Sequence, residues 1–157
     1  MVEGMIHYLQ REQIIPGSLK DVWTFFCDPF NLNTITPPDM NFEIVAGGDT
    51  KMYAGQMIEY RVEFIRGIRS LWLTEITHVR DEKFFVDEQR VGPYRFWHHE
   101  HLFESVHGGV KMTDRVTYIL PFGLLGDVTH AVWVQGRLNS IFNFRVRKIT
   151  ELFGGLQ

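Results

Sequence analysis

The chain has 157 residues, a formal net charge of −3 and no broad excess of basic residues. This balance argues against a protein that binds nucleic acid through a basic surface, so we expect no nucleic-acid partner. A chain of this length normally buries one substantial core, which predicts a single domain over residues 1–157. Aromatic residues make up 14% of the chain, enough either to fill a large core or to line a pocket.

The one cysteine, Cys27, excludes an internal disulfide and fits a reducing compartment. The apolar helical pattern around it favours a buried structural thiol over a catalytic one. No apolar run approaches the ~18 residues that span a bilayer, and no basic segment leads into such a run at the N-terminus. We therefore expect a cytoplasmic protein without integral membrane association.

The first third of the sequence predicts one strand followed by two helices. Residues 5–14 alternate loosely, as a strand does, until Pro16-Gly17 ends the pattern. Ser18 suits the N-cap of a helix whose apolar residues recur at intervals of three and four. Pro29 begins a second short helix, which Pro37-Pro38 stops.

From residue 41 the period of the apolar residues changes to two, which is typical of strands. Short turns join the segments, so an antiparallel sheet is favoured. The predicted strands cover residues 42–46, 57–66, 71–79 and 83–91, followed by two that begin near residues 94 and 110.

The strand that begins near residue 94 has an unusual face. Alternation places Trp97, His99, His101 and Phe103 on one side of it. Bulky aromatics mixed with groups that bind protons are uncommon in a plain core. This face therefore predicts an enclosed cavity with polar contents, toward which Asp87 of the preceding strand also points.

The register of the last hairpin follows from its turn. If Gly108-Gly109 are the two central turn residues, His101 faces Val116 and His99 faces Tyr118. Asp114 then lies diagonal to His101, within reach of its side chain.

The C-terminal segment predicts one long helix. Asp127 suits its N-cap, and helical spacing continues to Phe153. The basic residues near its end are interpreted as a solvated edge, favoured by the helix dipole. The stripe expected to cover the sheet contains Val128, Ala131, Val132, Gln135, Leu138, Ile141, Phe142, Arg145, Ile149 and Leu152.

This order of elements resembles the helix-grip fold of the START and birch-pollen-allergen superfamily, known as SRPBCC. In that fold a curved antiparallel sheet wraps around a long C-terminal helix and leaves a hydrophobic cavity between them. The resemblance implies an α+β fold with about seven strands over residues 5–153. Several segments also look like small bacterial proteins of the polyketide-cyclase/dehydrase-like branch: residues 32–38, 92–97, 99–103, 114–118 and 121–123.

The resemblance carries no catalytic residue over to this sequence, because the superfamily includes lipid carriers, hormone receptors, cyclases and oxygenase domains. Gly47-Gly48-Asp49 is too short for the glycine-rich loop of the pollen allergens. The sequence does not assemble the paired histidine and carboxylate ligands of the oxygenase iron site. We therefore expect neither a bound metal nor another cofactor.

His99 and His101 have three interpretations. They can be structural, with hydrogen bonds to Asp114, Tyr118 or water. They can also anchor the polar group of a ligand inside the cavity. As metal ligands, with Cβ atoms about 7 Å apart, they would take Asp114 as a third donor. Crowded aromatic surroundings argue against the metal, and the other two interpretations stay open.

The leading hypothesis is an intracellular, non-enzymatic protein that binds a small, largely hydrophobic molecule carrying a polar group. The aromatic members of the predicted site supply apolar contact, and the others orient a hydroxyl, carbonyl or carboxylate. The predicted ligand-binding residues are Tyr60, Trp72, Trp97, His99, His101, Phe103, Asp114, Tyr118 and Phe142.

The alternative is an enzyme of the cyclase, dehydratase or hydrolase type. His99 or His101 would act as general acid or base, and Asp114 would orient it. A third possibility is a protein-interaction domain, in which the outer surface and the Pro37-Pro38 loop contact a protein partner. Binding is favoured over catalysis, because a buried Asp114 serves equally well as a structural group.

Overall fold

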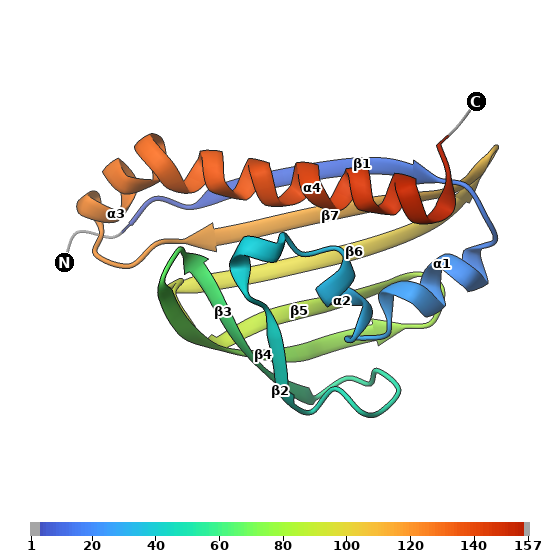
Figure 1. Cartoon of the computed structure of the whole chain (residues 1–157), viewed down its shortest axis with the longest axis horizontal. Helices are drawn as coiled ribbons and strands as arrows, with labels where there is room; N and C mark the ends of the chain where they lie inside the picture. Colours follow the sequence, from blue (N-terminus) through green and yellow to red (C-terminus); the bar gives the residue numbers. More distant parts are fainter. Residues whose placement is uncertain (1–3, 156–157) are drawn as a thin grey trace.

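The computed structural model describes residues 4–155, and these form one seven-stranded antiparallel sheet in the order β1-β7-β6-β5-β4-β3-β2. The long C-terminal helix lies along strands β1 and β7 (Figure 1). This arrangement confirms the predicted α+β helix-grip fold. The strands are β1 (His7–Ile15), β2 (Glu43–Ala46), β3 (Gln56–Ile65), β4 (Ile68–Arg80), β5 (Phe84–Val91), β6 (Phe96–Val106) and β7 (Gly109–Ile119).

Three short helical segments connect β1 to β2, and the first begins as predicted. The Ser18 hydroxyl accepts a hydrogen bond from the Asp21 amide at 3.1 Å, which satisfies a free donor of the first turn. Helical spacing then turns Val22, Trp23 and Phe26 toward the sheet. The segments are α1 (Leu19–Phe26), α2 (Asn31–Thr34) and the 3₁₀ turn η1 (Pro38–Met40).

The C-terminal helix begins earlier than predicted. It consists of α3 (Leu124–Thr129), a π-helical turn η2 (His130–Val134) and α4 (Gln135–Phe153). Phe122 and Gly123 have φ values of 69° and 52°, so the chain reverses at once after β7. The helix therefore starts at Leu124, and the predicted N-cap at Asp127 is wrong.

The predicted apolar stripe of this helix holds only along the middle of α4, because Gln135 and Leu152 near its ends are exposed. Leu138, Ile141, Phe142 and Ile149 are buried against the sheet. Val128 and Val132, in contrast, are exposed. The wider π-helical turn rotates the stripe relative to the preceding α3 residues, so their apolar positions no longer face the sheet.

The β6–β7 hairpin has a different register from the one predicted. Val106 pairs with Gly109, so the two turn residues are His107 and Gly108. Only Gly108 takes the left-handed conformation, with φ of 88°. A Cβ on Gly109 would lie 2.1 Å from the Ile15 carbonyl oxygen, so this glycine allows β1 to approach β7 rather than forming the turn.

The two-residue shift keeps every side chain on its predicted face while changing its partner. His101 now lies opposite Asp114, and His99 lies opposite Val116. A shift of one residue would have exchanged the two faces of the strand. The inward histidines therefore remain inward and come closer to Asp114 than the sequence predicted.

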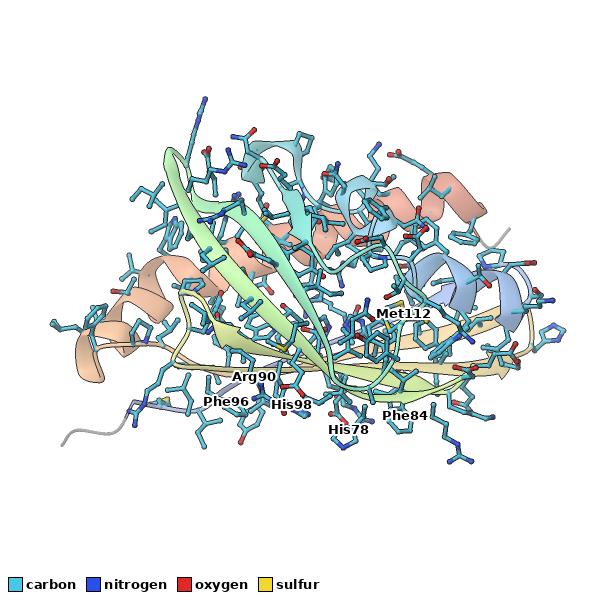
Figure 2. All side chains as sticks on the ribbon, turned by 90° about the horizontal axis from the view of Figure 1, so that it is seen from below. His78, Phe84, Arg90, Phe96, His98 and Met112 are labelled. Atoms are coloured by element: carbon cyan, nitrogen blue, oxygen red, sulfur yellow. The ribbon has the colours of Figure 1, made fainter. Side chains whose placement is uncertain are left out.

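The interior contains two apolar clusters. One lies under α1 and includes Trp23, Phe26, Phe85 and Phe103. The other lies under α4 and includes Trp97, Tyr118, Leu138 and Phe142. The opposite, outer face of the sheet carries Phe84, Arg90, Phe96 and His98 (Figure 2).

Candidate functional site

A cavity of about 170 Å³ lies between the sheet, the α1–α2 segment and α4. The cavity is partly open. The lining residues that are half-buried or exposed gather between Phe25 and Thr36, so this segment borders the opening. Most of the lining is apolar and includes Phe26, Ile58, Val62, Ile76, Leu138 and Ile141.

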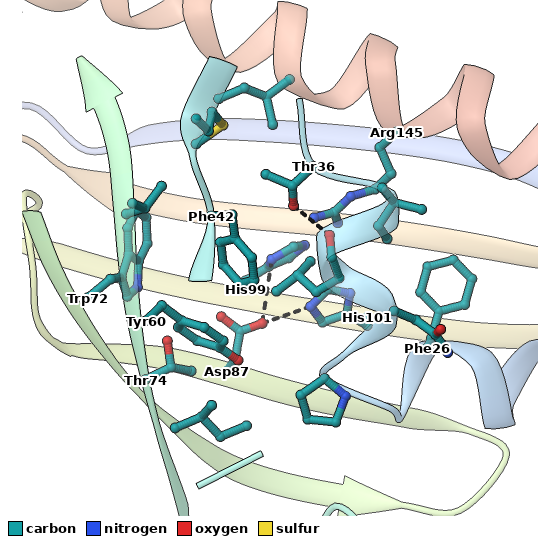
Figure 3. Close-up of a pocket in the computed structure, with 18 of the residues that line it drawn as sticks. Phe26, Thr36, Phe42, Tyr60, Trp72, Thr74, Asp87, His99, His101 and Arg145 are labelled. Carbon is teal, nitrogen blue, oxygen red and sulfur yellow. Dashed lines mark hydrogen bonds and ion pairs between the residues drawn. The ribbon is translucent and has the colours of Figure 1, made fainter. Parts of the chain in front are cut away.

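A small polar cluster forms one wall of the cavity. Asp87 of β5 lies opposite His99 of β6, and Asp114 of β7 lies opposite His101. Three neighbouring strands thus present four titratable side chains on the same face. Asp87, His99 and His101 line the cavity, and Figure 3 shows the Asp87 carboxylate between the two imidazoles.

Asp87 contacts both histidines through one oxygen. Its Oδ2 atom lies 2.7 Å from His101 Nε2 and 3.5 Å from His99 Nδ1. Its other oxygen, Oδ1, accepts no hydrogen bond from the described residues. The carboxylate therefore keeps accepting capacity beside the cavity.

Asp114 contacts the same two histidines from the other side. Its Oδ1 atom accepts a hydrogen bond from His99 Nε2 at 2.8 Å and lies 3.1 Å from His101 Nδ1. Arg145 of α4 adds a permanent cation, with Nη1 at 3.6 Å from the same oxygen. The guanidinium also lies over the Phe142 ring, 5.0 Å from its centroid.

Burial and charge act in opposition on the two carboxyl groups. Burial opposes their ionisation, but the adjacent histidines and Arg145 outweigh it, so the pKa values of Asp87 and Asp114 lie below the ordinary range. Both groups are therefore carboxylates at neutral pH.

The pKa values of the two histidines shift in opposite directions, although both side chains are buried beside the same carboxylates. Burial, followed by the charge of His101, lowers the pKa of His99 despite its carboxylate partners. Burial also opposes a charged His101, but hydrogen bonds to Asp114 and Asp87 outweigh it and raise the pKa of His101 above 6.5. The cluster thus favours a proton on His101 over one on His99.

Aromatic packing fixes the orientation of both imidazoles. The His101 ring stacks on Phe85 with centroids 4.1 Å apart, and the His99 ring meets Trp97 edge-on at 6.1 Å. The two imidazole centroids are 3.7 Å apart. These contacts leave little freedom to rotate, so the nitrogens are held toward the two carboxylates.

Six of the nine predicted ligand-binding residues line the cavity, and three lie behind its surface. Phe103 packs edge-on against Trp23 of α1 at 5.3 Å, which removes it from the cavity. Asp114 and Tyr118 lie on β7 and do not line the cavity, and Asp114 contacts the two imidazoles that do. The six lining residues are Tyr60, Trp72, Trp97, His99, His101 and Phe142.

Sequence reasoning placed Arg145 both in the solvated basic edge and in the stripe expected to cover the sheet, but gave it no role in the site. The Arg145 side chain is only 11% exposed and lines the cavity. Its spacing from Leu138, Ile141 and Phe142 was the available signal, because it places Arg145 on the buried stripe. A buried arginine needs a carboxylate partner, and Asp114 supplies it.

Cys27 takes no part in this site. Burial, with a smaller contribution from Asp81, raises the pKa of the Cys27 thiol to about 12. The thiol therefore stays protonated at neutral pH, which does not suit a nucleophile.

The fold is shared with solved structures of low sequence identity. Ginseng major latex-like protein 151 from Panax ginseng matches with a TM-score of 0.69 and 13% identity, covering 96% of this chain and 99% of that chain. Ara h 8.0201 matches with a TM-score of 0.64 and 18% identity, covering 94% and 99%. The protein TTHA0849 from Thermus thermophilus matches with a TM-score of 0.73 and 18% identity, covering 92% of this chain and 95% of that chain.

These likenesses show that the chain has the helix-grip fold that Ara h 8.0201 and the ginseng latex-like protein also have. No protein-family model matches the chain, and no curated protein matches it significantly. Within residues 4–155, no helix combines the length and apolar character needed to cross a membrane.

Proposed function

We propose that this chain binds one small, largely apolar organic molecule of about single-ring size that carries a hydroxyl group. The observation that carries the proposal is the composition of the cavity. Most of its wall is apolar, and its sheet side carries a polar cluster in which Asp87 retains an unused oxygen. Such a site gains affinity from apolar contact and orientation from a few polar groups.

The size of the ligand follows from the cavity volume of about 170 Å³. An apolar cavity of about 150 Å³ holds a benzene molecule. One substituted ring therefore fits without rearrangement of the sheet or helix. A larger molecule would have to extend through the opening beside α2.

The hydroxyl group follows from the charges of the cluster. Asp87 is ionised and beside the cavity, so its Oδ1 atom can accept a hydrogen bond from a ligand donor. A ligand carboxylate placed at Asp87 Oδ1 would meet its negative charge, so a neutral hydrogen-bond donor suits this oxygen better. A phenol or a small cyclic alcohol satisfies both the polar and the apolar parts of the cavity.

The test compares 4-methylphenol with toluene, which has almost the same shape but no hydroxyl. Calorimetric titration of the full chain should show one site that prefers 4-methylphenol. Asp87→Asn should weaken 4-methylphenol binding about tenfold and leave toluene binding unchanged, because a charged acceptor bonds more strongly than a neutral one. If Asp87→Asn weakens the binding of both ligands equally, or weakens neither, the role of Asp87 is contradicted.

A second pair of variants tests the location. Ile141→Trp adds bulk inside the cavity from α4 and should abolish binding of both ligands. Val91→Trp places the same side chain on an exposed position of β5 and should leave both affinities unchanged. If Ile141→Trp binds like the unmodified chain, the ligand lies elsewhere.

An acid–base enzyme, related to the bacterial polyketide-cyclase-like branch, is the second candidate. One contact favours it: Asp114 holds His99 Nε2 at 2.8 Å and leaves His99 Nδ1 toward the cavity and Asp87. A base oriented by a buried carboxylate can remove a proton from a bound cyclic ketone. No turnover of such ketones by the unmodified chain would eliminate this candidate, and turnover unchanged in both His99→Ala and His101→Ala would eliminate these histidines as the catalytic groups.

A further inference from the structure

Asp87, His99 and His101 have the mutual spacing of metal ligands. One donor atom from each of them lies within 4.8 Å of the other two. The histidine nitrogens nearest Asp87 Oδ2 are at 2.7 and 3.5 Å. A tetrahedral site with bonds of about 2.0–2.1 Å separates its donors by roughly 3.3 Å, a value that lies between the shortest of these separations and the 4.8 Å bound, so side-chain adjustments of about an ångström complete it.

Asp114 is placed as the outer carboxylate of such a site. Histidines that bind metal usually donate their other ring nitrogen to a carboxylate, which fixes the tautomer and the ring orientation. Asp114 Oδ1 lies 2.8 Å from His99 Nε2 and 3.1 Å from His101 Nδ1, which are the nitrogens turned away from Asp87. Asp114 therefore orients the His99 imidazole by a hydrogen bond and lies within ion-pair distance of the His101 imidazole.

Charge and access favour a cation on the Asp87 side. Two carboxylates face one guanidinium, and Arg145 approaches Asp114 rather than Asp87. Asp87, His99 and His101 all line the cavity, whereas Asp114 does not. An ion held by these three side chains would thus have a free coordination position directed into the apolar cavity.

We propose that Asp87, His99 and His101 bind one divalent transition-metal ion of the Zn²⁺ class, with Asp114 orienting His99 and supporting both imidazoles by its charge. Two imidazoles and one carboxylate suit such an ion better than Ca²⁺ or Mg²⁺, which prefer oxygen ligands. This inference goes beyond the binding of an organic molecule. It also replaces the sequence interpretation in which Asp114 was the third ligand.

The test uses the full chain, treated with a chelator, dialysed and titrated with Zn²⁺ in the absence of any organic ligand. Calorimetry should give one ion per chain. Asp87→Asn and His101→Gln should each weaken Zn²⁺ binding by more than about 100-fold, and Asp114→Asn by about 10–100-fold. His98→Gln is the matched control, because His98 is adjacent on β6 but faces outward (Figure 2).

Binding that persists in Asp87→Asn and His101→Gln, or that is lost equally in His98→Gln, would overturn the proposal. A titration without saturation at one equivalent would do the same. A readout on the unmodified chain covers any variant that fails to fold: paramagnetic Co²⁺ should broaden the imidazole NMR signals of His99 and His101 before that of His98. Titration with 4-methylphenol in the presence of chelator tests the proposed function separately. The proposal of ligand binding and the proposal of metal binding can therefore fail independently.

Discussion

The two faces of strand β6 carry similar histidine–carboxylate contacts in different surroundings. On the outer face, His98 Nδ1 lies 2.8 Å from Glu88, with side chains 29% and 23% exposed. On the inner face, His99 Nε2 lies 2.8 Å from Asp114, with side chains 5% and 9% exposed. An exposed pair contributes about 0–1 kcal/mol, whereas breaking a buried one costs about 3–5 kcal/mol. Burial, not distance, separates the two.

The faces also differ in how the contacts are connected. The outer contact joins β5 to β6, and Arg90 adds a second partner to Glu88 at 2.9 Å. The inner contacts join β5, β6, β7 and α4 through shared carboxylates. An apolar core would be at least as stable as such a cluster, so its presence beside a cavity favours a functional role.

The largest expected effect comes from removing the shared inner carboxylate. Asp114→Ala leaves two histidines and Arg145 without their common partner, and should reduce the free energy of unfolding by about 3–5 kcal/mol. Glu88→Ala on the outer face should cost less than about 1 kcal/mol. Urea unfolding of both variants measures the difference, and equal losses would contradict the contrast between the faces.

A smaller loss of stability is expected from replacing the arginine on each face of the sheet. Arg145→Leu removes the cation beside Asp114 but keeps apolar contact with Phe142, and should cost about 1–2 kcal/mol of unfolding free energy. Arg90→Leu removes an exposed cation near Glu75 and Glu88, and should cost less than about 0.5 kcal/mol. Thermal unfolding at matched pH compares them. A larger loss of unfolding free energy in Arg90→Leu than in Arg145→Leu would show that the ion pairs of the outer face contribute more to stability.

The inner cluster should also produce a pH dependence. Folding raises the pKa of His101 above 6.5, so the folded state holds this proton more tightly than the unfolded state. The stabilisation is complete below pH 6.5 and is lost as the pH rises through the raised pKa. In chelator-treated protein, the stability advantage over His101→Gln should therefore shrink above pH 6.5. An advantage that grows with pH would reverse the assigned sign.

The smallest effect is expected at His98. His98→Gln removes a partly exposed ring from the outer face and should change the free energy of unfolding by no more than about 0.5 kcal/mol. High salt should reduce even this difference, because exposed charges are screened. A loss comparable to that of Asp114→Ala, measured in the same urea series, would mean that position on the strand matters more than burial.

Much of the fold was predictable because local signals agreed with the tertiary arrangement. Alternation placed the strands, Ser18 capped the first helix, and the Gly92-Pro93 break separated β5 from β6. The hairpin register was wrong because Gly109 serves a contact with β1, far away in the sequence. The helix start was wrong because Phe122 adopts a left-handed conformation that its residue type does not announce.

The inward histidines and the nearby Asp114 were predictable, but the contacts of Asp87 and Arg145 were not. The alternation of side chains along a strand is enough to place His99 and His101 on one face. The pairing of Asp87 with both imidazoles depends on the register between β5 and β6, which no turn residue specifies. The contact of Arg145 with Asp114 depends on how α4 crosses the sheet, and this follows only from the packing of both clusters.

The most direct test of the binding site follows the three histidines of β6 in one experiment. Imidazole NMR signals of chelator-treated protein are recorded while 4-methylphenol is added. We predict saturable shifts for His99 and His101, which line the cavity, and none for His98, which faces outward. Shifts at His98 as large as those at His99, or no saturable shift at either inner histidine, would contradict the account.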